Sequence, residues 1–438
     1  MSFLPADDPH RHALHNEVHA RPSARIRLPA FILLVGVFNE DISREQEWEH
    51  LKKLQPSLSL QEMQGNFVRL RLDQYTLKWE RHTEFTRYSL VQDLPAAAGL
   101  DSQDPDLLPH LIVPQAWLAA IPGSTFSAIQ LVILPDDLSD PQAALARAKR
   151  WLGDDALIAS RMGQPAHSLV ATNFKLRDDG FEKILVLAPQ TTSSSRGGRI
   201  SQRLLELETY RLMALRGLPV AKAVSAQLGG AEKELASIIE ALEQQDCDDQ
   251  ALLTRLIGLA AKVERLTAEN AYRFAATAAY DKLVRERIAE LKESPISGTQ
   301  TIGDFMKRRL SPAMATVAAT SQRMVSLSER ISRASALLRT RVDIATEAQN
   351  RILLEKLTQG QELQLRLQTT VEGLSIAAIC YYVISLMLYA GKAAKAAGLN
   401  IHPELVAGAF IPLVLWLVWS ASKRLQDKLY KHKWRDGA

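Results

Sequence analysis

The chain has 438 residues, enough for two or three domains of ordinary size. Its formal net charge is only +4, which argues against a dedicated nucleic-acid-binding protein. Hydrophobic residues make up 47% and charged residues 23% of the chain, and these values exclude wholesale disorder. The two cysteines, Cys247 and Cys380, are too few for a disulfide framework or a cysteine-based zinc module.

Two uncharged stretches near the C-terminus predict membrane-spanning helices. The stretch Gly373–Gly391, as a helix, would cover roughly 28 Å of the ~30 Å hydrocarbon core. The stretch Leu405–Ser422 carries Trp416 and Trp419 near its end, where an aromatic belt belongs. The two stretches favour a multi-pass membrane protein over a pair of buried soluble helices.

The charges beside the two spans predict their orientation. The tail 423–438 holds six basic residues against two acidic ones, whereas the connection 392–404 holds only Lys392 and Lys395. The positive-inside rule then places the basic tail in the cytoplasm and the connection, as an outer loop, on the other side. Two spans return the N-terminal region to the cytoplasm, so we expect both termini there. The first residues lack the apolar run of a cleavable signal, and a cytoplasmic location suits two unpaired cysteines.

The region 1–190 has the mixed pattern of an α+β domain. Short apolar or alternating runs predict strands, with helical stretches between them. The predicted strands are 30–38, 66–72, 74–80, 84–91, 129–134, 168–175 and 183–188, and the predicted helices are 41–54, 114–120 and 141–151. The close spacing of the strands between 66 and 91 predicts an antiparallel meander. We interpret the serine- and glycine-rich residues 191–198 as a linker.

After the linker the pattern is helical. Residues 199–311 predict a cytoplasmic helical region, and a single long helix follows over 312–372 because no proline interrupts it before the first span. Five residues of this helix step by three and four, as in the apolar seam of a coiled coil. They are Met324, Leu327, Ile331, Ala334 and Leu338. We therefore expect a homo-oligomer assembled through the long helix.

A second stripe on the long helix is mostly polar and reaches into the first span. Its members are Gln361, Gln364, Gln368, Ser375, Tyr382, Ser385 and Tyr389. Polar groups in lipid need protein partners or water. The stripe therefore either forms helix–helix hydrogen bonds at a packing interface or lines a pore between several copies. Lys392 at the outer end of the stripe would repel cations.

Two sets of side chains are candidates for a site holding a divalent cation. His15 and His19 are four residues apart, a spacing at which two imidazoles on a helix can share an ion. Glu80, His82 and Glu84 alternate, so in an extended chain they lie on one face and could bind a cation or transfer protons.

Each of these sets also has a purely structural interpretation. The histidine segment is also compatible with a hydrogen-bonded motif that braces the start of the domain. In the second set, Arg81 and Arg87 could pair with the acids to give a polar cluster. No P-loop, dinucleotide-binding, zinc-protease or serine-hydrolase motif occurs, so we expect no enzyme activity.

Four segments of the chain resemble a bacterial family, the domain-of-unknown-function family 3422. They are HNEVHARP (15–22), LKWERHTEFTRYSL (77–90), GRISQRLLELETYRLMALRGLPVA (198–221) and LSIAAICYYVISLMLYAG (374–391). The resemblance implies a membrane-anchored protein of the bacterial inner membrane. It brings no known activity and no catalytic residues.

The order of the predicted parts is similar to that of the CorA metal-ion transporters. Those proteins form pentamers whose first span lines the pore, and a Gly-Met-Asn signature lies at its outer end. Gly398 and Asn400 form a Gly-Leu-Asn triplet in the outer loop here, and Glu404 follows it. The triplet lies beyond two lysines and farther from the span than the signature would.

These observations leave two classes of function open. The first is an oligomeric CorA-like ion channel or transporter with the polar stripe facing the axis. The second is a membrane-anchored cytoplasmic scaffold or sensor that binds a protein partner and transports nothing.

Overall fold

The computed structural model describes most of the chain and divides it into two compact units, Met1–Ser335 and Ala336–Ala438. The described residues are 8–11, 14–15, 24–58, 65–244, 248–398 and 402–433. The first unit takes in the predicted domain 1–190 and most of the helical region after it. The second unit contains the end of the long helix and the last helix.

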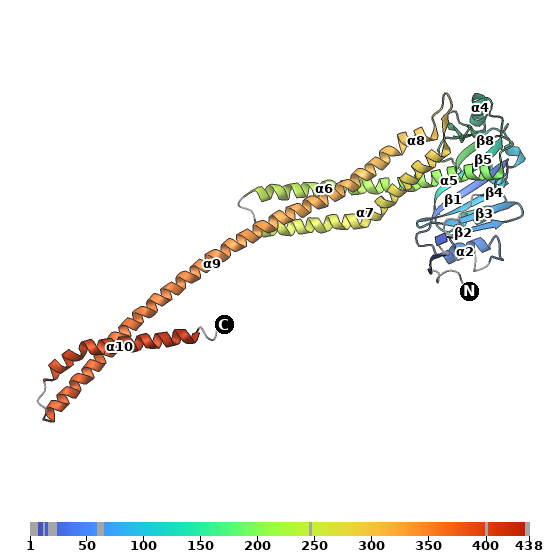
Figure 1. Cartoon of the computed structure of the whole chain (residues 1–438). Coiled ribbons are helices and arrows are strands. Elements are labelled where there is room, and N and C mark those ends of the chain that lie inside the picture. The colour runs from blue at the N-terminus through green and yellow to red at the C-terminus, as the bar shows by residue number, and fades with distance from the viewer. Residues whose placement is uncertain are drawn as a thin grey trace, which may run out of the picture. The chain divides into compact units, whose positions relative to one another are not determined.

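A mixed sheet organises the first unit (Figure 1). Its order is β2-β3-β4-β1-β5-β8-β7-β6-β9, and neighbours are antiparallel except β5 and β8. The strands are β1 Ala30–Phe38, β2 Phe67–Arg71, β3 Tyr75–Arg81, β4 Phe85–Asp93, β5 Ser124–Pro135, β6 Ile158–Met162, β7 Ser168–Thr172, β8 Glu182–Ala188 and β9 Ser294–Pro295. The predicted meander is confirmed as β2-β3-β4. The parallel β5–β8 pair makes the region α/β with a mixed sheet instead of the predicted α+β domain.

Helices cover both faces of the sheet, and β1 shows why its sequence is a continuous apolar run. Phe31 and Leu33 point into one buried cluster, whereas Ile32 and Leu34 point into the other. The first cluster is closed by tryptophans from three helices, namely Trp48 of α2 (Arg44–Lys52), Trp117 of α3 (Gln115–Ala119) and Trp151 of α4 (Pro141–Leu152). Two short 3₁₀ helices, η2 (Ala96–Ala98) and η3 (Leu108–His110), lie in the connection between β4 and α3.

The described chain after β8 is mainly helical up to the last helix of the second unit. The helices before that last one are α5 Ser194–Leu215, α6 Gly217–Glu243, α7 Asp249–Leu291, α8 Ile302–Arg309 and α9 Ser311–Ala396. Residues of α5, α7, α8 and the start of α9 form the second buried cluster with the sheet. Beyond it, α6, α7 and the first part of α9 run side by side (Figure 1), and Arg323 of α9 pairs with Glu232 of α6 at 2.8 Å.

The apolar seam of α9 packs within its own chain. Met324, Leu327, Ile331 and Ala334 are all buried, as are Leu228 and Leu235 of α6 and Leu256 and Leu259 of α7. Leu338, the last residue of the seam, is buried as well. The seam is thus buried within a single chain, and the expected assembly of copies through the long helix stays a prediction.

The predicted linker 191–198 is instead the start of α5. Ser193 caps this helix by accepting a hydrogen bond from the Arg196 N–H, and the Ile26 N–H donates to the Ser194 carbonyl at 2.9 Å. A Cβ atom on Gly198 would lie 1.6 Å from the Ala24 carbonyl oxygen. Glycine is therefore present because another segment crosses the helix closely, and not because the chain is flexible here.

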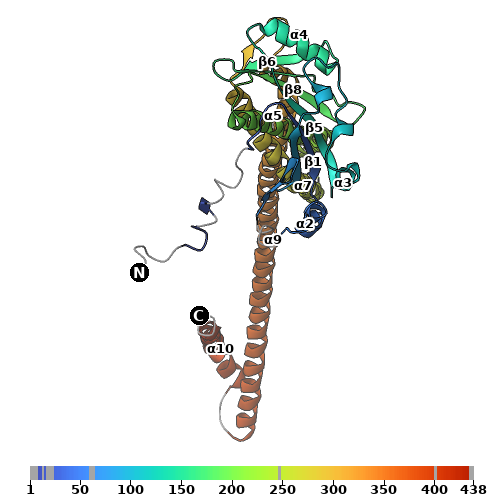
Figure 2. The same ribbon diagram turned by 90° about the vertical axis from the view of Figure 1, so that its right-hand side faces the viewer.

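The second unit contains the end of α9 and α10 (Pro403–Lys433), and α10 turns back beside α9 (Figure 2). Both helices are long and apolar enough to cross a membrane, and only 6% and 11% of their most apolar stretches are buried. The predicted spans 373–391 and 405–422 fall inside them. Because α9 continues to Ala396 and α10 begins at Pro403, the connection is shorter than the predicted outer loop 392–404.

Candidate functional site

One face of α9 packs against α10 in the second unit. Cys380 is 3% exposed, and Ala407 and Val414 of α10 are buried in the same way. Ile376 and Met387, about one turn and two turns from Cys380, are half-buried. These side chains are apolar, so the contact between the two helices uses an apolar face of α9.

The predicted polar stripe lies on the opposite face of α9. Tyr382 follows Cys380 by two residues and Tyr389 follows Met387 by two, which is about 200° around an α-helix. Tyr382 is 66% exposed, and Gln361, Gln364, Gln368, Ser375 and Tyr389 are exposed with it, whereas Ser385 is half-buried. Apart from Ser385, the stripe is therefore a face that α10 leaves uncovered.

The hydroxyl groups of this face have no hydrogen-bond partner in the described part of the chain. This holds for Ser375, Tyr382, Ser385 and Tyr389. The ring of Tyr382 contacts only that of its neighbour Tyr381, at 5.8 Å between centroids. Among the described residues, these hydroxyls form no hydrogen bond with α10, and helix–helix hydrogen bonds at an interface with another copy stay a prediction. The face consists of neutral amide, hydroxyl and small apolar groups, with Lys392 at its end.

The outer-loop candidates are only partly described. Gly398 ends the α9 side of the connection with a φ of 97°, a left-handed conformation that suits glycine. Glu404 is exposed in the first turn of α10. Asn400 lies outside the described residues, so the Gly-x-Asn triplet has no described geometry.

Glu80, His82 and Glu84 have separate partners. Glu80 is 2% exposed and pairs with Lys78 and Arg87, both at 2.9 Å. Burial alone would raise the pKa of Glu80, but the neighbouring Arg87 and Lys78 charges lower it. This carboxylate is therefore ionised and fully occupied by protein cations.

Glu84 ties the end of the sheet to the helices. It forms an ion pair with Arg273 of α7, accepts a hydrogen bond from the Tyr280 hydroxyl at 3.0 Å, and lies 3.6 Å from Arg216. Burial, followed by the Glu84 charge, raises the pKa of Tyr280. Glu84 is thus a structural anion that joins α7 and the junction of α5 and α6 to the sheet.

His82 completes the set and has ring and backbone contacts of its own. Its ring stacks on Phe85 at 4.4 Å, and its carbonyl accepts from the Asn39 amide at 2.9 Å. Arg81 pairs with Glu47 at 2.6 Å, as Arg87 does with Glu80. The predicted polar cluster of arginines and acids is confirmed, and the three alternating residues are not gathered around one point.

The histidine candidates are described only in part. His15 is exposed, and His19 lies outside the described residues. Over the described ranges, no group of three or more His, Cys, Asp or Glu side chains is arranged to hold a metal ion.

The sequence was also compared with known families and proteins. The model of a family described as protein of unknown function (DUF3422) matches residues 6–429. The chain belongs to this family. The match spans both units of the structure. No curated protein matches the chain.

This DUF3422 chain also contains a buried pair of carboxylates that the sequence pattern did not predict. Glu182 of β8 and Glu208 of α5 both contact Arg211, Glu182 at 3.1 Å. Burial, followed by the Glu208 charge, raises the pKa of Glu182 to about 9. Burial and the Glu208 charge thus favour the protonated form of Glu182, and the Arg211 charge opposes it. The two acids are far apart in sequence, and nothing in either segment indicates that they meet.

Proposed function

We propose that several copies of this protein assemble in the bacterial inner membrane with the polar stripe of α9 facing a common axis, and that small ions cross along it. The observation that carries the proposal is the position of the stripe opposite the face that packs on α10. A second copy, or water held between copies, would then cover Tyr382 and Tyr389 within the lipid.

The cost of lipid exposure supports this arrangement. A hydroxyl group moved from water to an apolar medium without a hydrogen bond costs roughly 2–7 kcal/mol. Four such groups on one face of one span would oppose insertion unless they met polar partners or water. The apolar face of α9 is already covered by α10, so lateral assembly through the polar face satisfies both faces of the helix.

The chemistry of the stripe favours ions that keep their water. Amide and hydroxyl oxygens can accept hydrogen bonds from the hydration shell, and the stripe has no carboxylate that would hold a cation tightly. Mg²⁺ gives up its water reluctantly, so the neutral part of the path suits a hydrated divalent ion, which would also have to pass the opposing charge of Lys392 at the outer end. The order of the segments along the chain also fits the CorA-like resemblance. A sheet domain comes first, followed by the long helix, the second span and the basic tail.

A pair of neighbouring tyrosines gives a matched test. In a chain with Cys247→Ser and Cys380→Ala, Tyr382→Cys and Tyr381→Cys differ by one position and, at 66% and 69% exposed, are equally open in a single chain. In the membrane, a charged, water-soluble thiol reagent should modify Cys at 382 and leave Cys at 381 unmodified, because 381 lies about 100° away and faces lipid.

Transport itself is measured with the same protein in liposomes. We expect entry of Mg²⁺, followed with an enclosed indicator dye, and we expect modification at 382 to block it. Native mass spectrometry should give a ring of at least four copies. A monomer or dimer with equal protection of both positions would contradict the proposal and would leave the membrane-anchored scaffold or sensor as the better explanation.

A further inference from the structure

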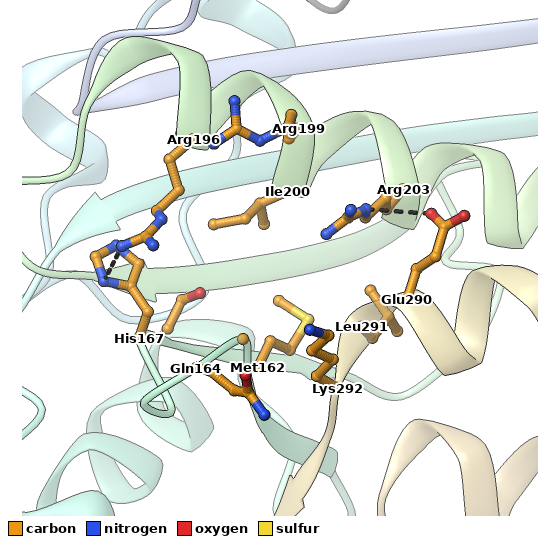
Figure 3. A pocket seen from close by; sticks show the side chains of 12 residues that line it. Met162, Gln164, His167, Arg196, Arg199, Ile200, Arg203, Glu290, Leu291 and Lys292 are labelled. Carbon is orange, nitrogen blue, oxygen red and sulfur yellow. Dashed lines mark hydrogen bonds and ion pairs between the residues drawn. The ribbon is translucent and has the colours of Figure 1, made fainter.

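A basic cavity of about 330 Å³ lies in the first unit, beside the sheet (Figure 3). Its walls come from three segments: the turn between β6 and β7, the first turns of α5, and the end of α7. The volume is at the lower end of the ~300–1,000 Å³ of small-molecule pockets. The cavity is therefore large enough for a small ligand, and it shares no residue with the second unit.

Positive charge dominates the walls. Arg196, Arg199 and Arg203 step by three and four along α5, so they share one face of the helix, and Lys292 faces them from the end of α7 (Figure 3). Glu290 is the one carboxylate among the lining residues, and it lies 3.3 Å from Arg203.

The charge is only partly neutralised. Glu290 is shared, because Arg287 also contacts it at 2.8 Å. Within the described ranges, Arg196, Arg199 and Lys292 form no ion pair with a carboxylate. The cavity thus has an excess of cationic groups, which an anion would balance.

His167 holds Arg196 in place. An Arg196 N–H donates to His167 Nδ1 at 3.0 Å, so this nitrogen carries no proton. The proton is then on Nε2, which donates to the Thr192 hydroxyl at 3.0 Å, and Thr192 donates to the Pro189 carbonyl. Burial, followed by the Arg196 charge, lowers the pKa of His167. A neutral imidazole therefore orients the guanidinium without neutralising it.

Ser168 is an independent indication of a ligand. It lines the cavity and is 1% exposed, yet its hydroxyl has no hydrogen-bond partner among the described residues. A buried hydroxyl without a partner costs about 1–3 kcal/mol. A ligand oxygen in the cavity would remove that cost.

Lys292 adds a related feature of the backbone. It ends α7 with a φ of 51°, in the left-handed region where glycine is the usual residue. The Cβ atom of a lysine makes this backbone conformation unfavourable. The same residue places a positive charge at the wall of the cavity.

We propose that this cavity binds a small phosphorylated molecule, with its phosphate held by Arg196, Arg199, Lys292 and the Ser168 hydroxyl. Guanidinium groups match phosphate oxygens with two parallel hydrogen bonds, and the phosphate dianion balances the unpaired charge. Met162, Ile200 and Leu291 line the rest of the cavity and provide an apolar surface for the organic part. The proposal does not depend on ion transport by the second unit.

The test is isothermal titration of the full-length protein in detergent. The probes are inorganic pyrophosphate, which supplies the phosphate groups alone, AMP, which adds an organic part, and adenosine, which lacks the phosphate. We expect saturable binding of AMP and of pyrophosphate, AMP being the tighter, and no binding of adenosine.

The Arg199→Gln/Lys292→Gln double variant should bind both phosphates at least ~10-fold more weakly, because it removes two charged contacts. Neither side chain forms an ion pair in the described structure, so the variant should fold normally. Lys222→Gln, which removes an exposed cation of α6 outside the cavity, is the matched control and should bind like the wild type. Ser168→Ala should weaken binding while leaving thermal stability unchanged or slightly higher.

Three results would overturn the proposal. They are no saturable binding of either phosphate at millimolar concentration, equal affinity in the double variant and the wild type, and equal loss in Lys222→Gln. The source of the phosphate is tested separately by adding phosphatidic acid dispersed in micelles of the same detergent. We expect them not to compete with AMP, because the cavity is sized for a small soluble molecule, and full competition would assign it to a lipid headgroup.

Discussion

Cys380 and Tyr382 stand on opposite faces of α9, one buried against α10 and the other left open. Met387 and Tyr389 repeat this arrangement two turns further on, Met387 being half-buried and Tyr389 exposed. This relationship predicts where two copies can be crosslinked.

Oxidation should join copies through position 382 and not through the native Cys380. With Cys247→Ser present, the wild-type Cys380 should stay monomeric on a non-reducing gel after treatment of the membranes with copper phenanthroline, because α10 shields it. Tyr382→Cys with Cys380→Ala should give a disulfide-linked dimer. The reverse pattern would mean that α10 does not cover α9 in the membrane and that the polar face packs elsewhere.

The seam of α9 predicts a loss of stability that does not depend on protein concentration. Leu327→Ala removes a fully buried side chain and should lower the free energy of unfolding by about 2–5 kcal/mol. Val325→Ala, two residues away and largely exposed, should change it by less than ~1 kcal/mol. Both are measured by denaturant unfolding of the full chain at two concentrations. If the unfolding midpoint of Leu327→Ala rose with protein concentration, the seam would pack between copies, as in an intermolecular coiled coil.

Two glycines distinguish close packing from flexibility. Gly198→Ala should be strongly destabilising, by more than ~3 kcal/mol, because its Cβ would overlap the Ala24 carbonyl oxygen. Gly229→Ala is the matched helical control: nothing lies within 4 Å of the added Cβ, so it should stabilise α6 by about 0.5–1 kcal/mol. Melting temperatures of the two variants check this, and a neutral Gly198→Ala would return 191–198 to the role of a linker.

The linker shows what local composition can and cannot predict. A run of serine and glycine is typical of loops, but the same residues cap a helix and admit a crossing segment, and only the position of Ala24 and Ile26 decides between these. By contrast, the apolar run 30–38 predicts β1 correctly, because a strand covered on both faces needs no alternation. The strand β6 was missed because Ser160 and Arg161 break its apolar pattern.

The candidate sites show the same difference between features within one segment and features that depend on distant segments. The polar stripe could be predicted, since all its residues belong to one helix and its period is fixed by helix geometry. The basic cavity could not, because its walls combine residues near 163, 199 and 291 that only the fold brings together. The one signal in the sequence was the spacing of Arg196, Arg199 and Arg203, which becomes informative once α5 is known to start at Ser194.

The raised pKa of Glu182 predicts that the stability of the folded protein depends on pH. Folding raises the pKa of Glu182 from 4.5 to about 9, so the folded chain keeps a proton that the unfolded chain releases. The stabilising contribution of this group is fully present below pH 4.5 and is lost as the pH rises toward about 9. Glu182→Gln mimics the protonated acid and should be more stable than the wild type at pH 8 by ~2 kcal/mol or more, with no gain near pH 4. Glu49→Gln, an exposed control on α2, should show no such difference. Parallel pH curves for Glu182→Gln and the wild type would mean that Glu182 does not hold this proton.

The left-handed backbone of Lys292 predicts a trade between stability and ligand binding. Lys292→Gly removes the Cβ atom that makes the φ of 51° unfavourable, and it also removes the charge at the cavity wall. It should raise the free energy of unfolding by about 1 kcal/mol, because glycine adopts this conformation without a Cβ clash. Its affinity for pyrophosphate should fall at the same time, by about threefold or more.

Lys292→Ala separates the two effects: it removes the charge and keeps the Cβ, so it should lose the same affinity without the gain in stability. If Lys292→Gly gained stability and bound pyrophosphate as tightly as the wild type, Lys292 would be only a helix terminus, and the phosphate would rest on the arginines of α5 alone.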